Sequence, residues 1–320
     1  MKSRLISIIR ASRLWCSDGH LESPGTQGSE LAGLDLAWYF RTYYKLLGPA
    51  PNTEDCAQDY IRNDGHPLRS PNLAFDELWY RHAYPSVTEQ IRAGRFRSGW
   101  AHYLAEGASQ RLNPNCWFDE HWYERRYCDV HLGIKNHSLQ CAFEHFLLYG
   151  IAQDLSPSLF FNVPWYRRQY LSNAAGAHPL THFLRGRHGS QPAPTPLFDA
   201  DWYNGQYLKT RPDPPTQQFT PFEHYLFIGR RVGHSPSPYF HEAAYRAANP
   251  DVSGKIEAGL YQSGLEHYFA EGMLDGLIAP RHIESSGVDY TSPAFLQFYE
   301  QSVTLNLKHV ASLREFTDTL

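Results

Sequence analysis

Five histidines recur in one sequence motif and are the first candidates for chemistry. The motif reads apolar-x-His-aromatic-apolar, with x-x-Gly after it in four copies, and its histidines are His102, His145, His182, His224 and His267. Imidazole is a general acid or base near neutral pH and a common metal ligand. A metal site needs several ligands that converge on one point, and histidines in similar units roughly 41 residues apart give no reason to expect convergence. We therefore predict neither a metal nor a cofactor, and expect each histidine to hydrogen-bond a neighbour beneath an aromatic layer, such as the Asp of an adjoining unit.

Another recurring pattern, F-D-x-x-W-Y-x-x-x-Y, precedes the histidine pattern in each copy and supplies carboxylates that could act as acids or bases. From copy to copy its Asp position is occupied in turn by Asp35, Asp76, Asp119, Asn162, Asp199 and His241. Catalysis by a carboxylate requires an ionisable acid, whereas Asp and Asn both accept hydrogen bonds from the free amides of a helix's first turn. The exchange of Asp for Asn therefore predicts helix N-caps, and no residue is assigned as catalytic.

The Trp-Tyr pairs of this pattern, and the arginines that follow them, suggest two kinds of binding surface. Paired rings can stack on sugars, but at helical spacing we expect them to form the core. Solvent-exposed arginines are common on helices, and regular stacking of the units would instead align them in a stripe that binds an anionic partner. The candidate stripe consists of Arg81, Arg125, Arg126, Arg167, Arg168 and Arg246.

These residues belong to an internal repeat. Residues 85–107 read PSVTEQIRAGRFRSGWAHYLAEG and residues 250–272 read PDVSGKIEAGLYQSGLEHYFAEG, so many positions match without a gap. We call the Trp-Tyr pattern the first motif and the histidine pattern the second motif. They alternate in about six copies of a roughly 41-residue unit, numbered here from the N-terminus, which predicts a repeat array over residues 34–282.

The local pattern in each copy predicts short helices. Apolar residues at i, i+3 and i+4 of the second motif indicate one face of a helix, and the glycine that follows, such as Gly107, indicates its C-cap. Val87, Ile91 and Gly94 suggest a further short helix between the motifs, and Pro- and Ser-rich turns join the copies. We predict an all-α fold, a solenoid-like array of about six helical-hairpin repeats whose aromatic faces are buried by stacking on their neighbours.

The two ends depart from the repeat. Residues 1–33 are a basic, partly apolar segment followed by a Ser- and Gly-rich linker. We interpret the basic segment as a terminal helix that frays or docks on a partner, and a helix lying on a membrane surface is the alternative. Residues 283–320 include Leu296, Tyr299 and Val303 at helical spacing and predict a C-terminal helix that caps the array. Pairing with another chain is the alternative for that helix.

Composition narrows the function classes. The net charge of -4 argues against a nucleic-acid partner, and no apolar run approaches the roughly 20 residues of a membrane span. The chain has five cysteines, an odd number, and no C-x-x-C, which argues against a zinc ribbon or a complete disulfide framework. We expect a soluble cytoplasmic protein with reduced thiols.

The motifs F-D-x-x-W-Y and H-Y-L-x-x-G, together with Cys128-Asp129-Val130 and Pro250-Asp251-Val252, resemble a bacterial tandem repeat. That repeat flanks glycosyltransferase, methyltransferase and related domains of surface-polysaccharide biosynthesis proteins, and the resemblance covers about residues 34 to 280. It implies no catalytic residue here. Our hypothesis is a non-catalytic helical-repeat module that recognises a protein partner or a glycan in polysaccharide biosynthesis. The alternative is a glycosyltransferase-type enzyme, or a fragment of one, with its site in the non-repeated segments.

Overall fold

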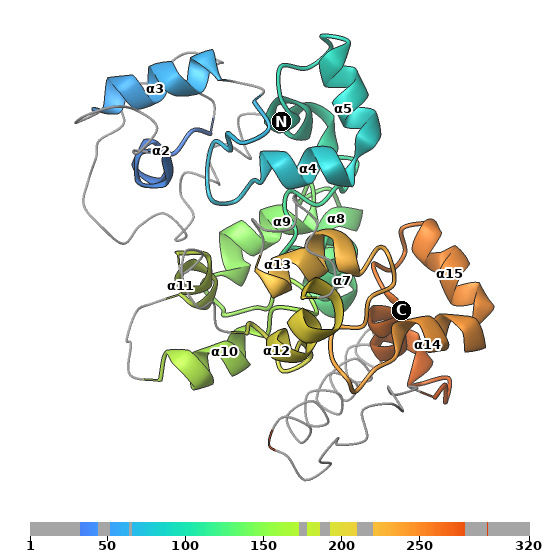
Figure 1. Ribbon diagram of the computed structural model, residues 1–320. Coiled ribbons are helices and arrows are strands. Elements are labelled where there is room, and N and C mark those ends of the chain that lie inside the picture. Colours follow the sequence, from blue (N-terminus) through green and yellow to red (C-terminus); the bar gives the residue numbers. More distant parts are fainter. Residues whose placement is uncertain are drawn as a thin grey trace. The chain divides into compact units, whose positions relative to one another are not determined.

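The structure is a computed structural model that describes residues 33–43, 52–63, 66–172, 178–185, 193–209 and 220–278, and residue 293 (Figure 1). Within these residues the regular elements are helices, and the one β-type contact is an isolated bridge between Ser158 and Phe161. The all-α prediction is thus confirmed for the described part of the chain. The predicted N-terminal segment, apart from Gly33, and the predicted C-terminal helix, apart from Pro293, lie outside the described residues.

The described residues of each copy form two or three short helices. The helices of the first motif are α2 (Leu36–Tyr43), α4 (Glu77–Ala83), α7 (Glu120–Arg126), α10 (Val163–Tyr170), α12 (Ala200–Tyr203) and α14 (Glu242–Ala248). Within the described residues an intervening helix, as expected from Val87 and Ile91, is seen in three copies as α5 (Pro85–Arg92), α8 (Cys128–Lys135) and α15 (Pro250–Glu257). The helices of the second motif are α3 (Thr53–Arg62), α6 (Gly99–His102), α9 (Ala142–His145), α11 (Pro179–Arg185), α13 (Pro221–His224) and α16 (Gly264–His267).

Several of these helices continue as wider, π-helical turns. The turns are η3 (Tyr103–Gly107), η4 (Phe146–Gly150), η5 (Asn204–Leu208), η7 (Tyr225–Gly229) and η8 (Tyr268–Gly272). The amide of Ala108, for example, donates to the carbonyl of Tyr103 five residues earlier, at 3.0 Å.

The prediction that the second-motif glycine is a C-cap is wrong. Gly107 is the last residue of the π-helical turn η3, whose C-cap is Ala108, and the next residue along the chain with a positive φ is Arg111 (59°). Glycine is required at position 107 for another reason: a Cβ there would overlap the hydroxyl oxygen of Tyr80 from the first motif. The same overlap would arise between Gly229 and Tyr203. The glycine therefore allows two helices of one copy to approach closely.

The turns between copies are held by the last tyrosine of the first motif. The turn that leads into the next copy contains a proline, and the tyrosine hydroxyl accepts the amide hydrogen of the residue just before that proline. The pairs are Tyr43–Ser70 (3.1 Å), Tyr84–Asn113 (2.8 Å), Tyr127–Ser156 (3.0 Å) and Tyr207–Ser235 (3.1 Å). The carbonyl of that Pro accepts the amide of the earlier copy's N-cap, as in Asp76 to Pro114 at 3.1 Å. Consecutive copies are thus joined by recurring polar contacts as well as by apolar packing.

Most aromatic residues of the motifs form the core, as predicted, although Trp38 and Trp202 are half-buried and Tyr170 is exposed. Trp79 and Tyr80 are 2% and 0% exposed, and the Trp-Tyr pairs of the third and fourth copies are buried as well. Phe75 packs its ring 5.0 Å from the ring of Tyr80, 5.1 Å from Trp100 and 5.6 Å from Tyr103, measured between ring centroids. Because each short helix carries only a few apolar residues, ring contacts between the two motifs join the helices of one copy into a core.

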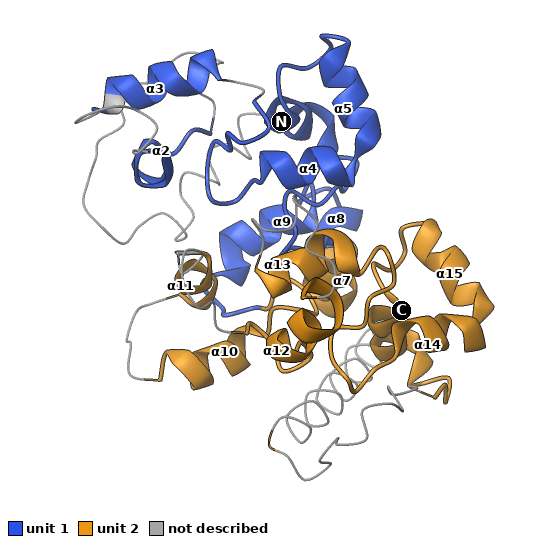
Figure 2. Cartoon of the chain, in the orientation of Figure 1, with its two compact units in different colours: residues 1–120, 132–155 blue, residues 121–131, 156–320 orange. Residues whose placement is uncertain are grey.

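The chain divides into two compact units, residues 1–120 with 132–155 and residues 121–131 with 156–320 (Figure 2). The boundary passes through the third copy, at α7 and α8, rather than between copies. Within the second unit Arg125 of the third copy forms an ion pair of 2.6 Å with Glu266 of the sixth copy, and its guanidinium lies 4.7 Å from the ring centroid of Tyr261. Contacts between copies are therefore not restricted to consecutive ones.

Candidate functional site

The second-motif histidines are hydrogen-bonded to tyrosines of their own copy. In four copies the histidine Nδ1 lies 2.8–3.0 Å from a tyrosine hydroxyl of the first motif. This tyrosine is the second residue of the Trp-Tyr position, and the pairs are Tyr80–His102, Tyr166–His182, Tyr203–His224 and Tyr245–His267. The predicted hydrogen-bonded, structural histidine is confirmed in these copies. The suggested partner was wrong, since it is a tyrosine of the same copy and not an aspartate of the next.

The first copy retains this bond with a different residue. Asp59 stands where the other copies have histidine, and the hydroxyl of Tyr39 donates to its Oδ2 at 2.6 Å. In the third copy His145 is 4% exposed, and its ring centroid lies 5.2 Å from that of Tyr149. A position that accepts either His or Asp as the partner of a buried tyrosine satisfies that hydroxyl, and does not require the proton affinity of an imidazole.

Burial favours the neutral form of three of these histidines. It lowers the pKa of His102, His224 and His267 below the ordinary value, because a charged imidazole loses its hydration inside the protein. The fifth copy adds His234, whose Nδ1 lies 2.9 Å from the same Tyr203 hydroxyl and whose ring stacks on Tyr207 at 3.9 Å. Burial, with a further contribution from His224, lowers the pKa of His234 to about 4. The Tyr203 hydroxyl can donate to only one of these two imidazoles and must accept from the other, so the pair requires two different neutral tautomers.

The aspartate position of the first motif caps helices, as predicted. In five copies its side chain accepts the amide hydrogen of the residue three positions later, in the order Asp35, Asp76, Asn162, Asp199 and His241. Asp76 Oδ1, for example, accepts from the Trp79 amide at 2.9 Å. Because an imidazole serves equally well in the sixth copy, the requirement is for an acceptor and not for an acid.

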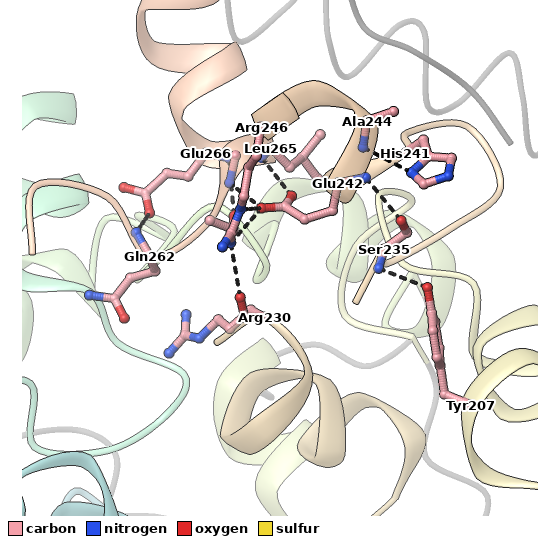
Figure 3. Close-up of polar contacts among 12 residues, drawn as sticks. Tyr207, Arg230, Ser235, His241, Glu242, Ala244, Arg246, Gln262, Leu265 and Glu266 are labelled. Carbon is pink, nitrogen blue, oxygen red and sulfur yellow. Dashed lines mark hydrogen bonds and ion pairs between the residues drawn. The ribbon is translucent and has the colours of Figure 1, made fainter. Parts of the chain in front are cut away.

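The sequence analysis missed a set of buried glutamates directly after this N-cap. Both oxygens of Glu242 accept amide hydrogens from the start of α16, Gly264 at 2.5 Å and Leu265 at 3.1 Å (Figure 3). Glu77 binds the first two amides of α6 in the same way, and Glu120 those of α9. We call each of these arrangements a clasp. A clasp satisfies two of the amides that a helix start leaves without an intrahelical partner.

One sequence signal accompanies the clasps. In the fourth and fifth copies the position after the N-cap holds Val163 and Ala200, and the second-motif helices of those copies begin with Pro179 and Pro221. Proline has no amide hydrogen, so those helix starts have one fewer donor to satisfy. Glutamate therefore occurs in copies whose second-motif helix starts with Gly or Ala.

Several arginines of the predicted stripe make contacts inside their own unit. Arg81 and Arg246 form ion pairs of 2.6 Å with the clasp residues Glu77 and Glu242, and their side chains are only 14% and 19% exposed. Arg125 donates to Glu266 and to the carbonyl of Leu260. The three others differ in exposure, since Arg126 and Arg167 are half-buried and Arg168 is exposed. These contacts do not bring the six arginines together.

The sixth copy contains a denser polar cluster around His267. Lys255 Nζ donates to Glu271 at 2.7 Å and lies 3.2 Å from His267 Nε2, and the Tyr261 hydroxyl also donates to Glu271. A lysine ammonium can only donate, so the imidazole Nε2 must accept and its proton must be on Nδ1, facing Tyr245. The second copy, similar in sequence, has Gln90 and Phe96 at the Lys255 and Tyr261 positions. The cluster is thus a local elaboration of the Tyr-His contact.

Among the residues that the structure describes, no group of three or more His, Cys, Asp or Glu side chains is arranged to hold a metal ion. Within the same residues, no helix combines the length and apolar character needed to cross a membrane. Comparison of the chain with protein-family models, with curated proteins and with solved structures gives no match.

Proposed function

We propose that the chain is a non-catalytic, solenoid-like module of six helical repeats that recognises a protein partner or a glycan in bacterial surface-polysaccharide biosynthesis. The observation that supports this best is the Tyr-His bond and its Tyr39–Asp59 counterpart in the first copy. In four copies the residue type most suited to acid-base chemistry satisfies a buried hydroxyl, and in the first copy an aspartate does the same. The motif residues thus serve the packing that all copies share, and recognition is left to residues that differ between copies.

The link to polysaccharide biosynthesis is supported by the resemblance of the first and second motifs to the bacterial repeat. Of the predicted arginine stripe, we propose Arg168, its most exposed member, as the residue that contacts an anionic partner. Arg81 and Arg246 are instead paired with buried glutamates. An acidic polysaccharide is the ligand that such an arginine would favour.

Two measurements on the purified full chain test this function. The first is binding to an array of neutral and acidic bacterial glycans, alongside crosslinking and affinity capture of protein partners. The second is turnover of nucleotide-sugar donors. We expect binding to a glycan or one defined partner, and no turnover. Absence of any saccharide or protein ligand would remove the support for a recognition module, and donor turnover would favour the glycosyltransferase-type alternative.

A charge-reversal pair tests the stripe separately. Arg168→Glu should weaken binding of an acidic glycan several-fold, whereas Lys209→Glu, at another exposed cation of the same unit, should leave it nearly unchanged. Equal losses in the two variants would indicate a nonspecific charge effect and exclude Arg168 as part of a dedicated site.

A further inference from the structure

The three clasps share one geometry but differ in whether an arginine pairs with the glutamate. In each, both carboxylate oxygens of a buried glutamate accept the first two amides of a second-motif helix; for Glu120 these are Ala142 at 2.8 Å and Phe143 at 3.1 Å. Glu77 and Glu120 are 1% exposed and Glu242 is 0% exposed. All three carboxyl groups therefore occupy equivalent, dehydrated positions, and their surroundings can be compared directly.

Two of the clasps have a cation four residues later on the same helix. Arg81 pairs with Glu77, and Arg246 pairs with Glu242, each at 2.6 Å. In the third copy this position is Glu124, which faces His131 at 2.9 Å. Within the described residues Glu120 forms no ion pair, so two amide contacts, rather than a paired cation, offset most of the loss of hydration of its charge.

The charged and titratable groups around Glu120 do not replace the missing arginine. Asp119, the preceding residue, opposes its ionisation, and Arg111 favours it from a distance. Cys141, the N-cap of α9, and Tyr103 of η3 are completely buried, and burial raises their pKa values well above the ordinary ones, so both stay neutral. The outcome is that burial raises the pKa of Glu120 to about 7, whereas the arginines offset part of the same rise for Glu77 and Glu242.

We propose that the Glu120 clasp is a proton-dependent latch: the closed contact between α9 and the buried Glu120 favours the protonated carboxyl, which still accepts an amide hydrogen at its carbonyl oxygen, and a rise in pH through neutrality favours opening of this contact. The clasps of Glu77 and Glu242, which contain an arginine, are much less sensitive to pH. A hydrated glutamate in the opened state has an ordinary pKa near 4.3, so between that pH and about 7 the closed state binds more protons. Closure is therefore strongest in acid and weakens as the pH rises, by up to about tenfold per pH unit.

Amide hydrogen exchange on the full chain tests the latch, with protection factors corrected for the intrinsic pH dependence of exchange, from pH 5 to pH 8. We expect protection of the Ala142 and Phe143 amides to fall by on the order of 10²-fold across this range. The equivalent amides of the other clasps, Gly99 with Trp100 and Gly264 with Leu265, are internal controls in the same sample and should change much less. Similar profiles at all three clasps would overturn the proposal.

Three variants separate the latch from general instability. Glu120→Gln removes the titrating group and should flatten the profile at Ala142 and Phe143. Glu124→Arg supplies the cation found in the other copies. The added positive charge favours ionised Glu120, so the fall in protection should move to lower pH. Glu124→Gln removes the negative charge that faces His131 without adding a cation, so it should shift the profile less. A pH-dependent profile that survives Glu120→Gln, or identical shifts in the two Glu124 variants, would refute the latch; the Glu124 pair decides the matter if Glu120→Gln does not fold.

Discussion

The backbone of Gly107 lies against the hydroxyl of Tyr80, so closely that no side chain can be accommodated between them. That hydroxyl also bonds His102, at 2.9 Å. One tyrosine oxygen thus fixes both the position of a histidine and the identity of a glycine, and the two helices of a copy meet at this point.

Gly107→Ala should therefore destabilise the protein by about 1–3 kcal/mol, because the added methyl group must displace the Tyr80 ring from a packed core. Gly254→Ala is the matched control: Gly254 lies inside α15 with nothing within reach of a new Cβ, and alanine there should stabilise by about 0.5–1 kcal/mol. Urea unfolding of both variants measures the difference. Equal stability of Gly107→Ala and the unsubstituted protein would contradict this account of the glycine.

Tyr80→Phe removes the oxygen and leaves a buried imidazole nitrogen of His102 without its partner, which should cost about 1–3 kcal/mol. The same change makes room beside Gly107. The double variant Tyr80→Phe with Gly107→Ala should therefore lose less than the sum of the single losses, with a coupling of about 1 kcal/mol or more in a double-mutant cycle. Additive losses would mean that the glycine and the hydroxyl act independently.

Cys141→Ser should stabilise the third copy by up to about 1 kcal/mol. Cys141 is the N-cap of α9 and makes no side-chain capping bond, whereas Ser98 and Ser263 at the equivalent positions accept the amide three residues later. Ser98→Ala is the reverse experiment and should destabilise by about 1 kcal/mol. Thermal unfolding distinguishes the two, and a destabilised Cys141→Ser would show that the buried sulfur packs better than a hydroxyl can cap.

His234→Leu should reduce sensitivity to acid. The pKa of His234 is lowered to about 4 in the fold, so between that pH and the ordinary value near 6.5 the unfolded chain binds a proton that the folded chain does not. Stability from this residue is present above pH 6.5 and is lost as the pH falls toward 4. Leucine is the residue of other copies at this position, as in Leu112 and Leu155, so the variant should still fold. Unfolding midpoints measured from pH 7 to pH 4 should fall less steeply in the variant, and parallel curves would contradict the prediction.

The sequence predicted the helical class, the N-caps and the buried rings because each is encoded within one copy. An aspartate, asparagine or histidine before a short apolar pattern indicates its cap, and Tyr80 and Tyr84 indicate their shared face by spacing alone. Repetition strengthened these predictions, since the exchange of Asp for Asn and His excluded a common acid.

The clasps, the glycine contact and the partner of each histidine could not be predicted in this way. Glu77 and Gly99 are 22 residues apart, and their contact depends on how two helices cross. The role of Gly107 was misassigned because a glycine after an apolar pattern also has a local explanation, the C-cap, and spacing cannot distinguish the two. The exchange between a glutamate after the N-cap and a proline at the next helix start was present in the sequence, but its meaning depends on knowing that the two positions touch.

The ion pair between Arg125 and Glu266 has a consequence for how this chain folds. The two residues are 141 positions apart, and closing a loop of that length costs roughly 4 kcal/mol of chain entropy in addition to a constant. A repeat array with contacts only between consecutive copies could fold or unfold one copy at a time. The contact between the third and sixth copies raises the contact order of the second unit, so we expect that unit to fold more slowly than a purely local array would.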